Sequence, residues 1–330
     1  MDAYSFDLPV LAAPTDSVVS PSTAAMIGEL GALGVLNLEG LWTRYEDPAA
    51  VLAEIQTLDP ARAVARLQEL YRTPISPDLM RARVRELRDM GITVACALSP
   101  QRAEEFAAIV TDAGVDIFVI RGTTVSAEHV STSAAPLNLK RFIYDLDVPV
   151  VVGGVATHSA ALHLMRAGAA GVLVGFGGGA THTTHQVLGV RVPMASAIAD
   201  VAAARSDYLD ESGGRYVHVI ADGGMGSTGD IVKAMACGAD AVMVGSMLAR
   251  ADEAPGRGRH WGMEAVHAHL PRGELVELGT VGSLAEILRG PSTMSTGLMN
   301  IAGALRRAVA TCGYPDLKEF QRVEVVVRGS

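Results

Sequence analysis

The sequence predicts an α/β fold, a single (β/α)8 TIM barrel formed by residues 1–330, and three observations support it. Apolar, strand-like runs alternate with helical periodicity along the whole chain, which is typical of parallel strands joined by right-handed crossovers. There are eight such runs. Gly-rich turns follow several of them at their C-terminal ends, where this barrel builds its sites. The alternative fold is an open, doubly wound parallel sheet.

The eight predicted strands are short and apolar throughout, as strands covered on both faces are. They are 8–14, 34–40, 92–98, 115–122, 148–154, 170–176, 216–224 and 240–246. Helical segments fit between them at 21–33, 48–58, 60–72, 77–90, 101–113, 138–146, 157–168, 192–210 and 228–237, and a last amphipathic helix covers 301–313.

Two places depart from a regular alternation of strand and helix. Residues 41–90 carry three helical segments between the second and third strands, where one would suffice. Residues 247–300 follow the eighth strand and are weakly periodic. Long excursions at the C-terminal rim of a barrel usually shape or cover a site. The first strand begins almost at Met1, without the hairpin that commonly plugs the lower end of a barrel, so we expect a minimal or truncated N-terminus.

Composition restricts the function classes. Apolar residues make up 49% of the chain, charged residues 19%, and the net charge is −9. Because no cluster of Lys or Arg appears, we expect no nucleic-acid partner. The sequence has neither an apolar run of ~18 residues nor a signal-peptide pattern, so we expect no membrane association and a cytoplasmic protein. Cys96, Cys237 and Cys312 are too widely spaced for a disulfide framework or a zinc site.

The most informative stretch is 216–246, YVHVIADGGMGSTGDIVKAMACGADAVMVGS. Two consecutive strands end in small, amide-rich turns, the first at Asp222-Gly223-Gly224 and the second at Gly245-Ser246. Such turns after the seventh and eighth strands form a phosphate site in many barrels, because backbone N–H groups approach the phosphate where no Cβ intervenes. Asp222 could accept hydrogen bonds from a ribose diol. The alternative is an ordinary pair of turns that binds no ligand.

The chain contains, in this order, LAAPTDSVVSPSTAAMIGELGALGVLN, VPVVVGGVAT, GVLVGFGGGATHTT, IADGGMGSTGDIVKAMACGADAVMVGSMLA and GALRRAVATCGYPDLKEFQ. In order and spacing these stretches resemble the IMP dehydrogenase/GMP reductase family over nearly the whole chain. Segment 41–90 is too short and too helical to hold the CBS module that many members insert. The chain is therefore most similar to the bacterial IMP-dehydrogenase-related paralogues that lack CBS domains.

The resemblance implies a purine nucleoside 5′-monophosphate (IMP, GMP or XMP) beside NAD(P), and a homotetramer. It also implies covalent chemistry, in which a loop cysteine attacks C2 of the base, hydride passes to or from NAD(P), and water or ammonia resolves the adduct. The implied nucleotide-binding residues are Asp222, Gly223, Gly224, Gly245 and Ser246, with Asp16 at the base and ribose and Met263 over the purine.

The loop 175–185, GFGGGATHTTH, departs from the family pattern where the chemistry occurs. His182 occupies the position of the nucleophilic cysteine, Ala180 that of a phosphate-binding serine, and His185 that of an arginine. Thr184 fits the pattern, so His182 and Thr184 are the catalytic candidates. His182 and His185 have no carboxylate or thiol nearby in the sequence, so we expect no transition-metal site.

On the cofactor side the resemblance implies Gly175, Gly177, Gly179, Arg121 and Gly154, and a monovalent cation at the 175–185 loop. Arg121 replaces an aspartate of the family and Gly154 an asparagine. Arg121 at a strand end would face the pocket and favour an anion, or else form a salt bridge at the rim. The flap after the eighth strand is short, around residues 270–273.

These residues leave three hypotheses open. The chain is an oxidoreductase of this family with an altered catalytic loop. Alternatively, it is a catalytically inactive, purine-nucleotide-binding regulator or partner subunit. The third reading is an FMN-dependent TIM-barrel oxidoreductase that uses the same phosphate site.

Overall fold

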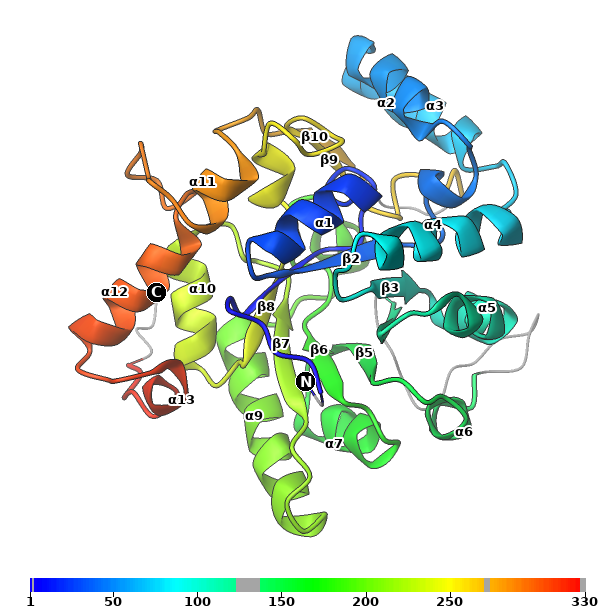
Figure 1. Ribbon diagram of the computed structural model, residues 1–330. Coiled ribbons are helices and arrows are strands. Elements are labelled where there is room, and N and C mark those ends of the chain that lie inside the picture. The colour runs from blue at the N-terminus through cyan, green and yellow to red at the C-terminus, as the bar shows by residue number, and fades with distance from the viewer. Residues whose placement is uncertain (2, 123–136, 270–273, 327–330) are drawn as a thin grey trace.

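A computed structural model describes residues 1, 3–122, 137–269 and 274–326. Eight parallel strands pair in chain order and close into a barrel, β8 pairing with β1, so the predicted fold is confirmed (Figure 1). The strands are β1 (Val10–Ala12), β2 (Leu33–Asn37), β3 (Ala95–Leu98), β4 (Ile117–Arg121), β5 (Val150–Val155), β6 (Gly171–Val174), β7 (His218–Asp222) and β8 (Ala241–Val244).

The helices lie around the strands, as Figure 1 shows. They are α1 (Pro21–Glu29), α2 (Pro48–Thr57), α3 (Pro60–Leu70), α4 (Pro77–Asp89), α5 (Pro100–Ala113), α6 (Leu139–Tyr144), α7 (His158–Arg166), α8 (Thr184–Leu188), α9 (Met194–Glu211), α10 (Thr228–Ala236), α11 (Leu284–Leu288), α12 (Ile301–Thr311) and α13 (Leu317–Phe320). Within the described ranges, none of these helices is long and apolar enough to cross a membrane.

The three helices expected between the second and third strands are present as α2, α3 and α4. Beyond β8 the chain forms a two-stranded antiparallel sheet that the sequence did not predict, β9 (Arg259–Trp261) with β10 (Leu275–Glu277). The expectation of a shortened flap at residues 270–273 falls outside the described residues.

Helices α1 to α5 each begin at a Ser-Pro or Asp-Pro pair. Proline fits the first helical position because its missing N–H has no partner there, and the preceding Ser or Asp can accept a bond from the first turn. Four of the five cap side chains do so, those of Ser20, Asp47, Asp59 and Ser76. These local signals fix where each strand-to-helix connection ends.

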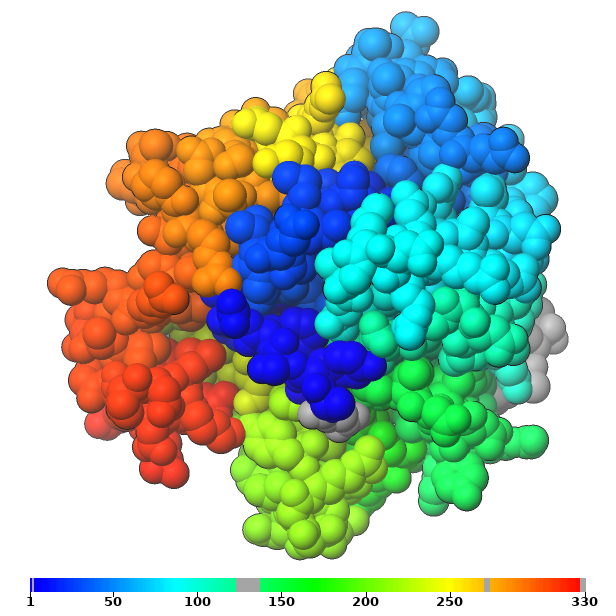
Figure 2. Space-filling model, viewed as in Figure 1, coloured from blue at the N-terminus to red at the C-terminus, as the bar shows by residue number. Residues whose placement is uncertain are grey.

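The apolar core has two layers. One lies between the barrel and the helices, and the other fills the barrel itself. The inner layer consists of alternate strand residues, including Leu11, Leu33, Val35, Ile117, Val119, Val151, Leu173, Ile220 and Met243. Met1, Tyr4 and Phe6 pack against this inner layer. Figure 2 shows the N-terminal segment, in dark blue, over the centre of the end of the barrel that faces the viewer.

The α2–α3 region is attached to the segment that follows β8. Gln56 Nε2 donates to the carbonyl of Gly256 at 2.7 Å, and Gln68 Nε2 donates to that of Ala265 at 3.3 Å. In the other direction, Arg259 Nη1 donates to two carbonyls at the end of α2, at 2.7 and 2.6 Å. The long excursion after β2 therefore supports the backbone of residues 256–265, which carries part of the site.

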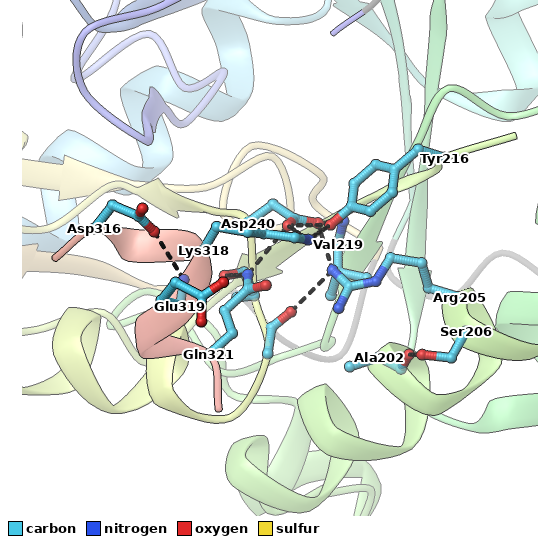
Figure 3. Close-up of polar contacts among 12 residues, drawn as sticks. Ala202, Arg205, Ser206, Tyr216, Val219, Asp240, Asp316, Lys318, Glu319 and Gln321 are labelled. Carbon is cyan, nitrogen blue, oxygen red and sulfur yellow. Dashed lines mark hydrogen bonds and ion pairs between the residues drawn. The ribbon is translucent and has the colours of Figure 1, made fainter. Parts of the chain in front are cut away.

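At the end of the barrel opposite the cavity, a polar network surrounds Asp240, which lies just before β8 (Figure 3). Its carboxylate accepts hydrogen bonds from Arg205 Nη1 at 2.7 Å and from the Tyr216 hydroxyl at 2.6 Å. The backbone N–H of Val219 and the side chain of Gln321 also donate to it, at 2.9 and 3.1 Å. The network joins α9, β7 and the C-terminal helix α13 to the lower end of the barrel.

Candidate functional site

A cavity of about 1470 Å³ opens at the C-terminal ends of the strands. Most of the residues singled out from the sequence line it: Arg121, Gly175, Gly177, Gly179, His182, Asp222, Gly223, Gly224, Gly245, Ser246 and Met263. Thr184, Asp16 and Gly154 are not in its lining. The fold thus brings the predicted nucleotide, catalytic and cofactor residues into one cavity, with three exceptions described below.

The turns after β7 and β8 open into this same cavity. Gly223 and Gly224 have φ angles of +102° and +75°, a region that favours glycine, so their backbone can lie close to a ligand. Gly245 is not among the glycines with positive φ, but a Cβ there would lie 3.1 Å from Nε2 of His260. Small residues at both turns therefore keep the backbone amides accessible.

His260, which the sequence analysis did not identify, also lines the cavity. It is 4% exposed, and its Nδ1 lies 2.8 Å from the hydroxyl of Ser17. Burial, together with the nearby His182 and Arg121, lowers the pKa of His260 to about 3. The imidazole is therefore neutral at pH 7, with one nitrogen on Ser17 and the other beside Gly245.

An ion pair spans the mouth of the barrel from β4 to β7. Arg121 Nε lies 3.2 Å from Asp222 Oδ2, and the two side chains are 20% and 14% exposed. Burial opposes the charged guanidinium, but Asp222 and Glu264 outweigh it and raise the pKa of Arg121. Arg121 thus lies in the cavity wall and is paired at the same time, so the carboxylate predicted to bind a ribose already has a cationic partner.

A second ion pair joins His182, on the loop after β6, to Glu264, in the segment after β9. Nδ1 of His182 lies 3.1 Å from Glu264 Oε1, and the side chains are 13% and 11% exposed. Burial favours the neutral carboxyl group, but contact with His182 and the charge of Arg121 lower the pKa of Glu264 to about 2. Glu264 is therefore a carboxylate at neutral pH, and it meets the imidazole at the position where the family pattern has a thiol.

Thr184 and Gly154 support the loop from below rather than line the cavity. Thr184 is 2% exposed, and a Cβ on Gly177 would lie 2.7 Å from its Oγ1. A Cβ on Gly154 would collide with the carbonyl oxygen of Gly175. Both residues fix the path of the loop by close packing.

Asp16 lies behind the cavity wall, 1% exposed, in a closed hydrogen-bond network. The Leu41 N–H donates to its Oδ2 at 2.6 Å, the Tyr71 hydroxyl donates to the same oxygen, and Asn37 Nδ2 donates to Oδ1 at 3.3 Å. Asn37 Nδ2 also lies 3.2 Å from Met263 Sδ, and both of these residues line the cavity. Asp16 is therefore connected to the cavity through its hydrogen bond with Asn37.

Replacing Asp16 with asparagine is expected to change how stability depends on pH. Burial raises the pKa of Asp16 to about 6, although bonds from Tyr71, Leu41 and Asn37 oppose the rise. The native state therefore binds the proton more tightly than the unfolded chain, and stability from this group falls as pH rises from ~4 to ~6. The difference between a pKa of about 6 in the native state and about 4 in the unfolded chain corresponds to roughly 3 kcal/mol of stability.

Urea unfolding at several pH values measures this effect. The free energy of unfolding of the native protein minus that of Asp16→Asn should fall between pH ~4 and ~6 and then level off. The control is Asp89→Asn, at an exposed helix position. If the difference in unfolding free energy between the native protein and Asp16→Asn does not change with pH, the raised pKa of Asp16 is wrong.

Within the described ranges, no group of three or more His, Cys, Asp or Glu side chains is placed to hold a metal ion. His182 is committed to Glu264, and His185 is exposed at the start of α8.

The sequence analysis missed Glu264 and His260, although a signal was present. Both flank Met263 in the short stretch HWGME, the segment expected over the purine. Two titratable side chains within four residues of a predicted ligand contact mark a candidate catalytic segment.

Comparisons with known proteins agree with this geometry. The family model described as "IMP dehydrogenase / GMP reductase domain" matches residues 2–330. An uncharacterized oxidoreductase of Mycobacterium tuberculosis is 52% identical over 338 residues, covering 100% of this chain and 90% of that protein. An inosine-5′-monophosphate dehydrogenase of Methanocaldococcus jannaschii is 34% identical over 70% of this chain and 49% of its own length. Among solved structures, an IMP dehydrogenase/GMP reductase-like protein from Corynebacterium glutamicum superposes with a TM-score of 0.93 at 51% identity, covering 99% of this chain and 87% of that one.

Proposed function

This chain belongs to the IMP dehydrogenase/GMP reductase family, and we propose that it is an oxidoreductase acting on a purine nucleoside 5′-monophosphate with NAD(P). The single observation that carries the proposal is the convergence of the β7 and β8 turns on one cavity. In the proposed complex the amides of Gly223, Gly224, Gly245 and Ser246 hold the phosphate. Asp222 takes the ribose diol, and Met263 covers the base.

The cavity also has room for a nicotinamide cofactor. Its volume of about 1470 Å³ exceeds the ~300–1,000 Å³ usual for a single ligand. Away from the β7 and β8 turns it is lined by Ser99, Gln101, Arg102 and Lys140, which offer hydrogen-bond donors and positive charge to a dinucleotide. When bound, the nicotinamide supplies the hydride acceptor or donor. A monovalent cation at the 175–185 loop and a homotetramer remain predictions from the family.

A thermal-shift series against IMP, XMP, GMP, AMP and FMN tests the proposal. A purine monophosphate at ~100 times its dissociation constant should stabilise the fold by ~2.7 kcal/mol. Reduction of NAD(P)+ with IMP, or oxidation of NAD(P)H with GMP, should accompany binding. Binding without turnover would favour the regulator, and a yellow protein stabilised by FMN alone would overturn the proposal.

We also predict that Asp222→Asn removes the preference for a ribonucleotide over its 2′-deoxy analogue. Hydrogen bonds to a carboxylate contribute ~1.5–3 kcal/mol, so the native protein should bind IMP roughly 10- to 100-fold more tightly than 2′-deoxy-IMP. The amide keeps the shape but lacks the charge, and the preference should fall to a few-fold.

Competition binding with the two nucleotides measures this preference. The matched control is Asp207→Asn, an exposed change on α9 that should leave the preference intact. Equal discrimination by the native protein and Asp222→Asn would exclude Asp222 as the ribose ligand.

A further inference from the structure

Two loops that are far apart in the sequence contact each other at the mouth of the barrel. His182 lies on the loop after β6, and Glu264 follows β9. Between them a Cβ on Gly262 would lie 3.0 Å from Glu264 Oε2 and 3.1 Å from the Thr181 hydroxyl. Gly262 therefore leaves no room for a side chain where the side chains of Thr181 and Glu264 pack against it, and the contact between His182 and Glu264 lies beside this close packing.

The chemistry of this contact fixes the roles of the ring nitrogens. Glu264 is ionised and can only accept a hydrogen bond. Nδ1 of His182 is buried and has no hydrogen bond of standard geometry, and the nearest ionised group is this carboxylate at 3.1 Å, so hydrogen on Nδ1 matches the acceptor beside it. Nε2 is the nitrogen left to a ligand or water, and in the neutral ring it is unprotonated and basic.

The ring of His182 lies in a cluster of charged side chains. In the cluster formed by Arg121, His182, Asp222, His260 and Glu264, the two carboxylates face a single guanidinium. His260 stays neutral beside them. An imidazolium formed during turnover would therefore lie beside a carboxylate, and not as an uncompensated charge in a buried site.

We propose that His182 and Glu264 form a proton-transfer pair, in which His182 Nε2 is the general base and Glu264 is the positioning residue that holds the ring. The proposal rests on the proposed function and gives that site a chemical step that needs no thiol.

With IMP the step balances as follows. A water O–H bond breaks, its proton goes to Nε2 of His182, and its oxygen bonds to C2 of the purine. The C2–H bond breaks with its electron pair, which NAD(P)+ accepts as hydride. His182 afterwards returns the proton to solvent, and the products are XMP, NAD(P)H and one proton.

Direct attack by His182 on the purine is the competing use of the same nitrogen. Glu264 contacts one edge of the ring, and the backbone of Gly179 lies near the opposite edge, where an added Cβ would be 2.9 Å from Cδ2. Proton exchange with a water at hydrogen-bond distance needs no movement of the ring. Covalent attack needs the purine carbon to reach bonding distance.

The first test uses the protein without ligand, so its result does not depend on turnover. In protein labelled with ¹⁵N-histidine and kept above the ordinary imidazole range, at about pH 8, the His182 signals are assigned by their loss in His182→Gln. We expect a protonated Nδ1 and an unprotonated Nε2. In Glu264→Gln the two nitrogen shifts should move toward each other as the other tautomer becomes populated. A native ring with hydrogen on Nε2, or one unchanged by Glu264→Gln, would overturn the proposal.

The second test separates chemistry from binding. General-base catalysis contributes about 10²- to 10⁴-fold, so we expect Glu264→Gln to lower kcat by about 100-fold with KM within about threefold. Glu69→Gln, an exposed change on α3, is the matched control and should leave both constants unchanged. The thermal shift with IMP should persist in Glu264→Gln.

Mass spectrometry of the denatured protein after mixing with IMP and NAD(P)+ completes the test. We expect no covalent adduct, and a purine mass on the His182 peptide would overturn the base role. If no purine nucleotide stabilises the native protein, the proposed function fails, and the NMR result still decides whether the His182–Glu264 pair exists.

Discussion

Replacing Ser246 with aspartate is expected to abolish the stabilisation that a purine monophosphate gives the native protein. Ser246 lines the cavity at the turn after β8, next to Gly245. A carboxylate there would stand beside the phosphate. Two like unit charges about 4 Å apart repel by about 4 kcal/mol at an effective dielectric constant of about 20, so affinity should fall by at least ~100-fold.

Thermal shift and calorimetric titration with IMP and GMP measure this loss. Ser246→Ala, which removes only a hydroxyl, should weaken binding far less. Ser206→Asp, an exposed change on α9, controls for added negative charge and should bind like the native protein. If Ser246→Asp keeps its full response, the phosphate does not lie at the β7 and β8 turns.

Replacing Asp240 with alanine is expected to cause the largest loss of stability. Asp240 and Arg205 are only 13% and 11% exposed, and the carboxylate also holds Tyr216 and the Val219 N–H. Removing one partner of such a pair leaves a buried charge uncompensated and costs about 3–5 kcal/mol.

Urea midpoints give the size of this effect, and a double variant tests its cause. If the unpaired guanidinium is responsible, Asp240→Ala with Arg205→Met should recover part of the loss. Asp316→Ala removes only the cap of α13, whose side chain accepts from Glu319 N–H at 2.8 Å, and should cost ~1 kcal/mol. A loss for Asp240→Ala no larger than that of the cap variant would contradict the prediction.

The network should also respond to acid. Burial opposes ionisation of Asp240, but Arg205, Tyr216 and the Val219 amide outweigh it and lower its pKa. The stability it contributes is therefore fully present above the unfolded pKa of ~4 and is lost as pH falls through the native pKa.

The sequence predicted the backbone of the site better than its side chains. All eight strands and the turns at Gly223 and Gly245 follow from local apolar runs and glycines, which act within a few residues. The orientation of Asp16 does not follow from such local signals, because its carboxylate accepts a hydrogen bond from Tyr71, at the end of α3, behind the cavity wall. Asp16 and Tyr71 are separated by 55 residues.

The same limit applies to the charged pairs. Arg121 and Asp222 were each expected at the mouth of the barrel, but their pairing joins residues 101 apart, on strands that are not neighbours in the sheet. Glu264 lies in a turn just after β9, a strand that the sequence analysis did not predict. The contact between Glu264 and His182 thus arises from tertiary packing, which the periodicity of apolar residues in the sequence cannot predict.

The attachment of α2 and α3 to residues 256–265 has a consequence for protein engineering. Two stretches of chain separated by some two hundred residues behave as one structural module, so transplanting either alone into a related barrel breaks its anchors. Exchanging both together would transfer the part of the cavity wall that bears His260 and Glu264 as a unit, together with the hydrogen bonds that anchor it.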